Sequence, residues 1–208
     1  MRALTWNLYH GRASEPARRS LLAEFCASLA GWEWDVALLQ EVPPWWPPAL
    51  ARACGASFAD VRTSRNALPG VRRAVASRNP DLLGANGGGA NAILSRVRFS
   101  EHRARRLTWW PERRWAHAVL VDEGWVVNVH TSTHREAWAR RDTLRAFTWA
   151  PRPLLVFGGD LNLTSVSLPG LRHVAGNHVD HLFSSRPGVP EVLERGVLSD
   201  HPPVRVTL

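Results

Sequence analysis

The feature that most limits the fold of this chain is the length of its apolar segments, which charged residues, Pro or Gly interrupt after a few positions. Runs of about four to eight apolar residues have the length of buried strands rather than of helices. None approaches the roughly 18 apolar residues of a membrane span, which excludes a transmembrane helix. The expected strands are 3–8, 35–41, 119–121, 126–130, 154–157, 179–183 and 204–208.

Two segments have helical spacing. The first is expected to begin near Ser14, with Pro16 in its first turn, where a missing amide hydrogen costs little. The second is expected to begin at Thr133, because Thr133 and Glu136 fit a capping box. Strands before and between two helices predict a mixed, layered α/β domain. Between Thr63 and Ala90 the pattern is lost among Arg, Asn, Pro and Gly, which predicts a mobile loop, either a tolerated insertion or one that embraces substrate.

Composition sets the broad class of the protein. With 208 residues, 45% hydrophobic and 21% charged, the chain is expected to form one globular domain, 1–208. All 26 basic residues are Arg, against 18 acidic ones, for a net charge of +8. This excess favours a polyanionic partner only weakly, since GC-rich codons would also produce it. Two cysteines give no disulfide framework, and the polar N-terminus does not resemble a secretory signal, so we expect a cytoplasmic protein.

Polar side chains collect where the expected strands end. Any one of them, taken alone, is most often a turn former or a helix cap. Their recurrence at successive strand ends favours a functional site, because an α/β scaffold displays its site there. The residues are Asn7, Glu41, His130, Asp160, Asn162, Asp180, Asp200 and His201.

Short motifs containing these residues resemble those of the endonuclease/exonuclease/phosphatase superfamily, and they follow one another in the family's order over nearly the whole chain. They are Trp6-Asn7, Leu39-Gln40-Glu41, the segment 91–96, Asn128-Val129-His130, Gly158-Gly159-Asp160-Leu161-Asn162, the segment 179–183 and Ser199-Asp200-His201. The resemblance implies a four-layer αββα sandwich of two mixed sheets flanked by helices. It also implies a divalent metal, Mg²⁺ or Mn²⁺, at one edge, which would neutralise charge on phosphate oxygens.

The resemblance also implies roles for individual residues. Glu41 matches a metal ligand, with Asn7 and Asp200 near the metal. Asp160 matches the carboxylate that orients the attacking water, and Asn162 would hold Asp160 and a phosphate oxygen. His201 would donate to phosphoryl oxygens while Asp180 orients its ring. His130 matches a position occupied by His in deoxyribonucleases and sphingomyelinases, where it would assist the leaving oxygen or bind phosphate.

Four further residues are candidates for substrate binding. Asn91 and Arg96 belong to one of the matched motifs, and Arg96 would either contact phosphate or form a surface ion pair. Trp46 and Trp110 lie in Pro-containing loops and either pack the loops or offer surfaces to bases or lipid. The histidines near Asp180 fit no zinc spacing.

The sequence therefore predicts a metal-dependent phosphodiester hydrolase, a nuclease acting on DNA or RNA. One alternative is a phosphatase or phosphodiesterase of a lipid head group or a small phosphorylated metabolite. Another is a catalytically inactive nucleic-acid-binding module, although none of the matched positions is replaced. We expect a monomer without stable membrane association.

Overall fold

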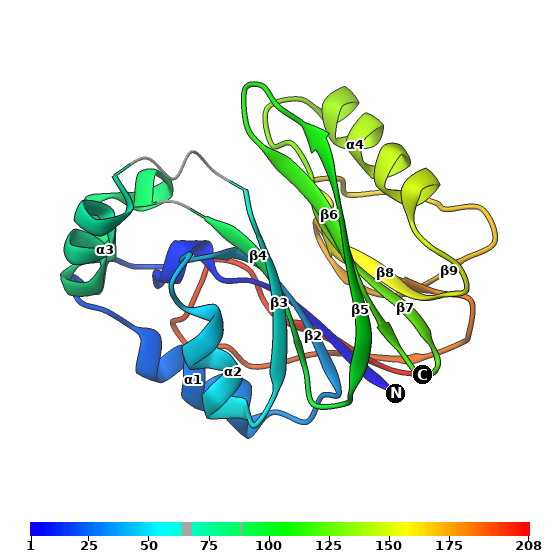
Figure 1. Ribbon diagram of the computed structural model, residues 1–208, viewed down its shortest axis with the longest axis horizontal. Coiled ribbons are helices and arrows are strands. Elements are labelled where there is room, and N and C mark those ends of the chain that lie inside the picture. The colour runs from blue at the N-terminus through cyan, green and yellow to red at the C-terminus, as the bar shows by residue number, and fades with distance from the viewer. Residues whose placement is uncertain (64–67, 88) are drawn as a thin grey trace.

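The computed structural model describes residues 1–63, 68–87 and 89–208. Two six-stranded sheets face each other in the middle of the molecule, and helices cover their outer faces (Figure 1). The first sheet has the order β11 (Val189–Val192), β12 (Val204–Thr207), β1 (Arg2–Asn7), β2 (Val36–Val42), β4 (Ala90–Ser95) and β3 (Ser57–Arg62). The second has the order β5 (Phe99–Thr108), β6 (Arg114–Val121), β7 (Gly124–His130), β8 (Leu154–Asp160), β10 (Asp180–Ser184) and β9 (Arg172–Asn177).

The helices complete the four layers. Helices α1 (Leu22–Gly31) and α2 (Pro47–Cys54) cover the outer face of the first sheet, and α4 (Glu136–Trp149) covers that of the second. Helix α3 (Pro69–Arg78) lies beside the short 3₁₀ helices η2 (Pro80–Leu82) and η3 (Gly84–Gly87), and a third, η1 (Tyr9–Gly11), follows β1. This is the predicted αββα sandwich. None of the helices in the described ranges is long and apolar enough to span a membrane.

Alternation along the strands divides the apolar side chains among the layers. On β1, Leu4 and Trp6 pack against α1 and α2, whereas Ala3 faces the second sheet. On β8, Phe157 packs toward α4 and Val156 faces the first sheet. Because successive strand residues point to opposite faces, every second residue of these strands lies between the sheets. The polar residues at the ends of these two strands lie on the same face of each strand as these inter-sheet residues.

The expected strands are all present, several of them longer than predicted. The strands β3, β5, β9 and β11 were missed because many of their residues are exposed and because charged residues, Pro or Gly interrupt their apolar residues. Strand β4 is fully buried, but its segment entered the prediction only as a motif.

The predicted helix starts were wrong. Helix α1 begins at Leu22 rather than near Ser14, because Ala13 bridges the loop at Leu198 and the Ser14 amide donates to Val197 O. Tertiary contacts hold this segment outside the helix. Helix α4 begins at Glu136, and its N-cap residue makes no side-chain cap hydrogen bond, so the capping box at Thr133 is not used.

The expected loop between Thr63 and Ala90 contains α3, η2 and η3. Helix α3 buries none of its residues, so its sequence carries no apolar face from which a helix could be predicted. Positions 64–67 and 88, on which the loop prediction also falls, lie outside the described residues.

Candidate active site

Four of the candidate residues continue the inter-sheet faces of their strands at one end of the sandwich. In the second sheet, the pairing register places His130 beside Asp160 and Asp160 beside Asp180, so these three residues form a row across β7, β8 and β10. Asn7 ends β1 in the facing sheet and donates to Asp160 Oδ2 at 2.9 Å. The topology thus gathers side chains that are far apart in the sequence.

Two glycines allow β8 to approach its neighbours closely just before Asp160. A Cβ at Gly158 would lie 2.2 Å from His181 O on β10, and one at Gly159 would lie 2.0 Å from Val129 O on β7. Gly159 also has φ of +131°, which L residues rarely adopt. The Gly-Gly-Asp motif is therefore a packing requirement as well as a chemical one.

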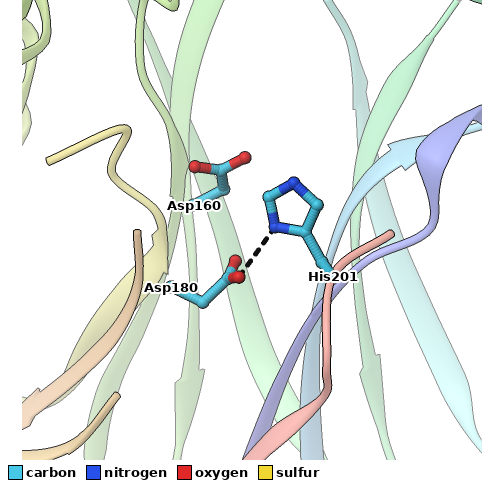
Figure 2. A group of neighbouring side chains, drawn as sticks. All are labelled: Asp160, Asp180 and His201. Atoms are coloured by element: carbon cyan, nitrogen blue, oxygen red, sulfur yellow. Dashed lines mark hydrogen bonds and ion pairs between the residues drawn. The ribbon is translucent and has the colours of Figure 1, made fainter. Parts of the chain in front are cut away.

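Asp160, Asp180 and His201, which we call the acid–histidine group, converge from β8, β10 and the segment before β12 (Figure 2). Their ligand atoms lie within 4.8 Å of one another. His201 Nδ1 is 2.7 Å from Asp180 Oδ2, and both carboxylates are almost completely buried. His201 is anchored through its backbone, because its carbonyl accepts from Trp6 Nε1 and its amide donates to Ser199 Oγ.

Burial and charge perturb both partners of the Asp180–His201 pair. Burial raises the pKa of Asp180 to about 7, helped by the negative charges of Asp160 and Asp200, although the hydrogen bond from His201 acts to lower it. Burial alone would lower the pKa of His201, but the hydrogen bond to Asp180 and the surrounding carboxylates outweigh it and raise this pKa to about 9. His201 is therefore protonated near neutral pH and suited to bind an anion.

Asp160 is held in place from two sides. Asn7 donates to its Oδ2, and the backbone amide of Asn162 donates to its Oδ1 at 3.0 Å. The side chain of Asn162 donates instead to Thr131 O at 3.2 Å, so Asn162 orients Asp160 through its main chain. Each carboxylate oxygen keeps a second lone pair with which to accept a proton or contact a cation.

Glu41 and Asp160 both lie near the same ring atom, His130 Nε2. His130 Nε2 is 3.6 Å from Asp160 Oδ2 and 3.9 Å from Glu41 Oε1, and His10 Nε2 is 3.1 Å from Glu41 Oε2. Glu41 has a left-handed φ of 50° at a register shift in β2, and His10 has φ of 55°. Strained backbone of this kind concentrates at functional sites.

Two residues of the site were not predicted as part of it. Arg114, which is buried, donates from Nη1 to the His130 ring at 2.9 Å and pairs with Glu112, and its buried Nε has no partner among the described residues. Burial, followed by the positive charge of Arg114, holds the pKa of His130 well below its ordinary value, so this ring is neutral. His10 follows Asn7 by one helical turn, but no motif distinguished it or Arg114 from other basic residues.

The acid–histidine group fits a divalent cation. Its two buried carboxylates offer the oxygen ligands that such cations prefer. Asp180 Oδ1 is buried without a hydrogen-bond partner in the described part of the chain, and an uncompensated carboxylate oxygen is costly unless a cation or donor satisfies it. Of the predicted metal ligands, Asn7 contacts this group, Glu41 Oε1 is 3.9 Å from His130 Nε2, and the exposed Asp200 is 3.8 Å from His201 Nε2.

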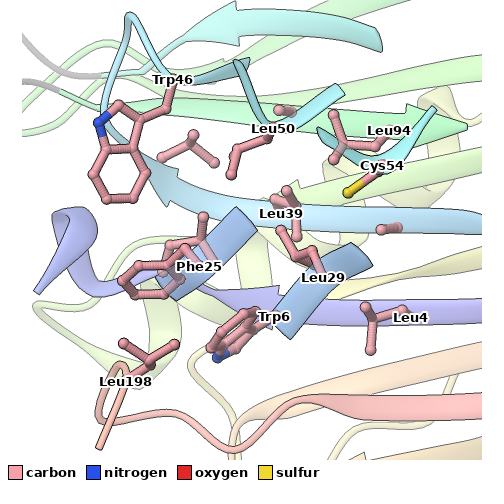
Figure 3. Packing of buried hydrophobic residues seen from close by; sticks show 14 of the residues in the cluster. Leu4, Trp6, Phe25, Leu29, Leu39, Trp46, Leu50, Cys54, Leu94 and Leu198 are labelled. Carbon is pink, nitrogen blue, oxygen red and sulfur yellow. The ribbon is translucent and has the colours of Figure 1, made fainter. Parts of the chain in front are cut away.

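The structure separates the four candidate substrate-binding residues. Arg96 lies away from the site, where it donates to carbonyls that include Leu29 O and Trp32 O and stacks on Trp34. Trp46 is buried against Phe25 in the core between α1 and α2 (Figure 3). It therefore packs its loop and offers no surface to a base or lipid. Asn91 is buried and donates to Trp115 O at 3.4 Å. Trp110 is 70% exposed and lines the cleft described next.

A cleft of about 690 Å³ opens beside Glu41 and His130. Its lining includes Arg72 from α3, Arg113 from the β5–β6 connection and Arg114 from the start of β6. Some of the 26 arginines therefore lie at the approach to Glu41. His130, which lines the same cleft, also lies next to Asp160. The position of these arginines agrees with the need to compensate an acidic site before an anionic substrate can enter.

Comparison with known proteins identifies the family. The model of the Endonuclease/Exonuclease/phosphatase family matches residues 4–201, and the chain belongs to this family. Members are phosphoester hydrolases and are generally dependent on divalent metals, so the chain is an enzyme of that class. No curated protein matches the chain in a direct sequence search.

Solved structures show the same fold at low sequence identity. An endonuclease/exonuclease/phosphatase from Beutenbergia cavernae DSM 12333 has a TM-score of 0.75 and 19% identity, covering 99% of this chain and 70% of that one. A mannosyl-6-phosphatase from Bacteroides thetaiotaomicron VPI-5482 has a TM-score of 0.69 and 13% identity, with 100% and 98% coverage. TDP2 from C. elegans has a TM-score of 0.66 and 16% identity, with 99% and 74% coverage.

Proposed function

We propose that this phosphoesterase is a Mg²⁺- or Mn²⁺-dependent phosphodiesterase that acts on nucleic acid. The observation that carries the proposal is the cleft, which joins His130 and Glu41 to three arginines and the exposed Trp110. Arginines suit a phosphate backbone, and an exposed indole on the rim suits an unstacked base.

The proposed reaction is hydrolysis by a water that Asp160 orients. Asn7 and the Asn162 amide fix the Asp160 carboxylate, which accepts the proton as the water oxygen attacks phosphorus. The bond between phosphorus and the leaving oxygen breaks in this displacement, and the leaving oxygen takes up a proton from solvent. His201 Nδ1 is bound to Asp180, which leaves Nε2 to donate to a phosphoryl oxygen. Arg114 has donors to offer the same phosphate. Asp160, Asp180, Asn7 and Glu41 would hold the cation, which neutralises charge on the phosphoryl and leaving oxygens when bound.

A substrate panel tests the proposal. Abasic duplex, plain duplex, single strands, inositol phosphates and sphingomyelin are incubated with the enzyme and Mg²⁺, Mn²⁺ or chelator. We expect cleavage of a nucleic acid that requires metal and whose KM rises steeply with salt, because polyanion binding releases counterions. Preferred hydrolysis of inositol phosphates or sphingomyelin would replace nucleic acid by a small or lipid substrate. No hydrolysis of any substrate and no metal binding would favour an inactive module.

A further inference from the structure

A second, smaller pocket of about 220 Å³ adjoins the cleft and is lined by Pro44, Trp45, Arg62, Pro69, Arg72 and Arg73, together with a glycine. Arg72 lines both this pocket and the cleft, so the two cavities share a wall. Pro44 and Trp45 follow Glu41 closely in the sequence, and Arg62 ends β3. We call this cavity the arginine pocket.

The charge of the arginine pocket is largely uncompensated. Its lining contains no acidic residue, and within the described ranges neither Arg72 nor Arg73 forms an ion pair. Arg62 interacts electrostatically with Asp60 on the same strand. In the groove between β5 and α4, by comparison, two of the five lining arginines have acidic partners, Arg140 in Glu136 and Arg141 in Asp142. Unpaired arginines that converge on a concave surface mark an anion site, since like charges repel unless a ligand separates them.

Two other features of the arginine pocket suit a phosphate-bearing group. The pocket lies at the N-terminal end of α3, where the helix dipole favours an anion. Half-buried Trp45 and the two prolines form an apolar wall against which a ring can pack. A ligand with a phosphate that contacts the arginines and a ring that packs on the apolar wall has the two parts of a nucleotide.

We propose that the arginine pocket binds a phosphate group of the substrate other than the one that is cleaved. The proposal rests on the proposed function for the identity of the substrate and goes beyond it by assigning a second phosphate subsite. In a nucleic acid this is a phosphate further along the strand. In a small metabolite it is a second phosphate on the same molecule.

The test uses Arg73→Gln, alone and with Arg62→Gln, because neither residue lines the cleft. Arg78→Gln removes the same charge from the last turn of α3 and is the matched control. KM is measured for a bis-aryl phosphate, which has one phosphate, for single strands of increasing length, and for an inositol monophosphate and bisphosphate.

For substrates with two or more phosphates, we expect the pocket variants to raise KM by about three- to tenfold, the loss of one or two charge-assisted contacts. KM for the bis-aryl phosphate and for the monophosphate should stay unchanged, and Arg78→Gln should leave every substrate unaffected. An effect on longer strands alone identifies a nucleic-acid phosphate, and an effect on the bisphosphate alone identifies a small molecule. Equal KM changes with all substrates, or none, would overturn the subsite.

Binding of a labelled single strand in chelator separates this proposal from the proposed function. If Arg73→Gln weakens that binding and Arg78→Gln does not, the subsite stands even if no substrate is cleaved. If nucleic acid is cleaved but binding and KM are unaffected by the pocket variants, the subsite is wrong and the proposed function stands.

Discussion

Two groups of buried polar side chains lie between the same two sheets, and they differ in charge and in how their hydrogen bonds are met. One is the acid–histidine group at the strand ends. The other, which we call the amide–histidine network, consists of the buried Gln40, Asn128 and His117 and of His102, which is exposed at its outer end. It lies further inside along β2, β7, β6 and β5.

The amide–histidine network is neutral and nearly satisfied. Gln40 donates to Asn128 Oδ1 at 2.8 Å, and Asn128 Nδ2, which has two hydrogens, lies 3.0 Å from the backbone carbonyls of Leu39 and Ala92 in the opposite sheet and 3.2 Å from His117 Nε2. Gln40 Oε1 is its one buried side-chain atom without a partner in the described structure. Burial, followed by the charge of His102, lowers the pKa of His117 to about 3, so this ring stays neutral.

The acid–histidine group is ionisable and has an unpaired carboxylate oxygen. Burial raises the pKa of Asp180, and the hydrogen bond to Asp180 and the nearby carboxylates raise that of His201. A neutral network of this kind stabilises the packing of the two sheets, whereas clustered carboxylates cost stability and are retained for chemistry. Burial of polar residues therefore does not by itself identify a site. The distinguishing property is unmet charge beside an opening.

The largest expected effects come from the acid–histidine group. Asp160→Asn and His201→Ala should each reduce metal-dependent turnover by orders of magnitude, because they remove the water-orienting carboxylate and the phosphate donor. Turnover of a bis-aryl phosphate and denaturant unfolding check this together, and the unfolding midpoint should be retained. Near-wild-type rates in both variants would refute the assignment of the site.

The network should show the opposite pattern. Asn128→Leu removes the amide that contacts Leu39 O, Ala92 O and His117 Nε2 and leaves buried groups unpaired, so we expect the free energy of unfolding to fall by about 3 kcal/mol. His102→Gln, at the exposed end of the network, should cost about 1 kcal/mol or less. Denaturant unfolding measures both, and an Asn128→Leu variant as stable as the wild type would show that the network does not support the packing of the sheets.

The pH dependence of activity should report on Asp180 and His201. If protonated His201 binds phosphate, kcat/KM should fall as the pH rises through about 9, the raised pKa of this ring. Asp180→Asn removes the carboxylate that raises the pKa of His201. The fall of kcat/KM on the alkaline side of the pH profile should therefore move to lower pH by about one to three units. Normalised pH–rate profiles of the two proteins provide the test, and a fall at the same pH in both would exclude His201 as the titrating group.

The pH dependence of stability should report on His117 instead. Its pKa in the folded protein is lower than the ordinary 6.5, so its contribution to stability is complete above that pH and is lost as the pH falls toward 3. The loss amounts to about 1.4 kcal/mol per pH unit in this window. In His117→Asn, the free energy of unfolding should fall less steeply by that amount between neutral pH and about pH 5. If it falls as steeply as in the wild type, groups other than His117 cause the loss of stability.

Polar residues at strand ends are visible in the sequence without a structure, and five of them lie together at one end of the sandwich: Asn7, His130, Asp160, Asp180 and His201. Their roles in catalysis stay predictions. Arg114 and His10 could not be distinguished, because their roles follow from how the β5–β6 connection and η1 meet the cleft. The tryptophans show the same limit, since Trp46 and Trp110 have similar flanking prolines and one is buried while the other is 70% exposed.

The fold was predictable where strands are buried and less so elsewhere. The strands between the layers have apolar runs, but β5 and β11 are mostly exposed, and α3 buries no residue. The start of α1 was misplaced because contacts of Ala13 and Ser14 with the loop before β12 override local helix signals. Long-range pairing of this kind leaves no local pattern.

The most direct test of the central claim is a titration of the enzyme with Mg²⁺ while hydrolysis of a bis-aryl phosphate is followed. The account predicts no turnover in chelator, saturable activation by Mg²⁺ in the wild type, and no activation in a folded Asp160→Asn variant. Hydrolysis that persists in chelator, or equal activation of Asp160→Asn, would contradict it.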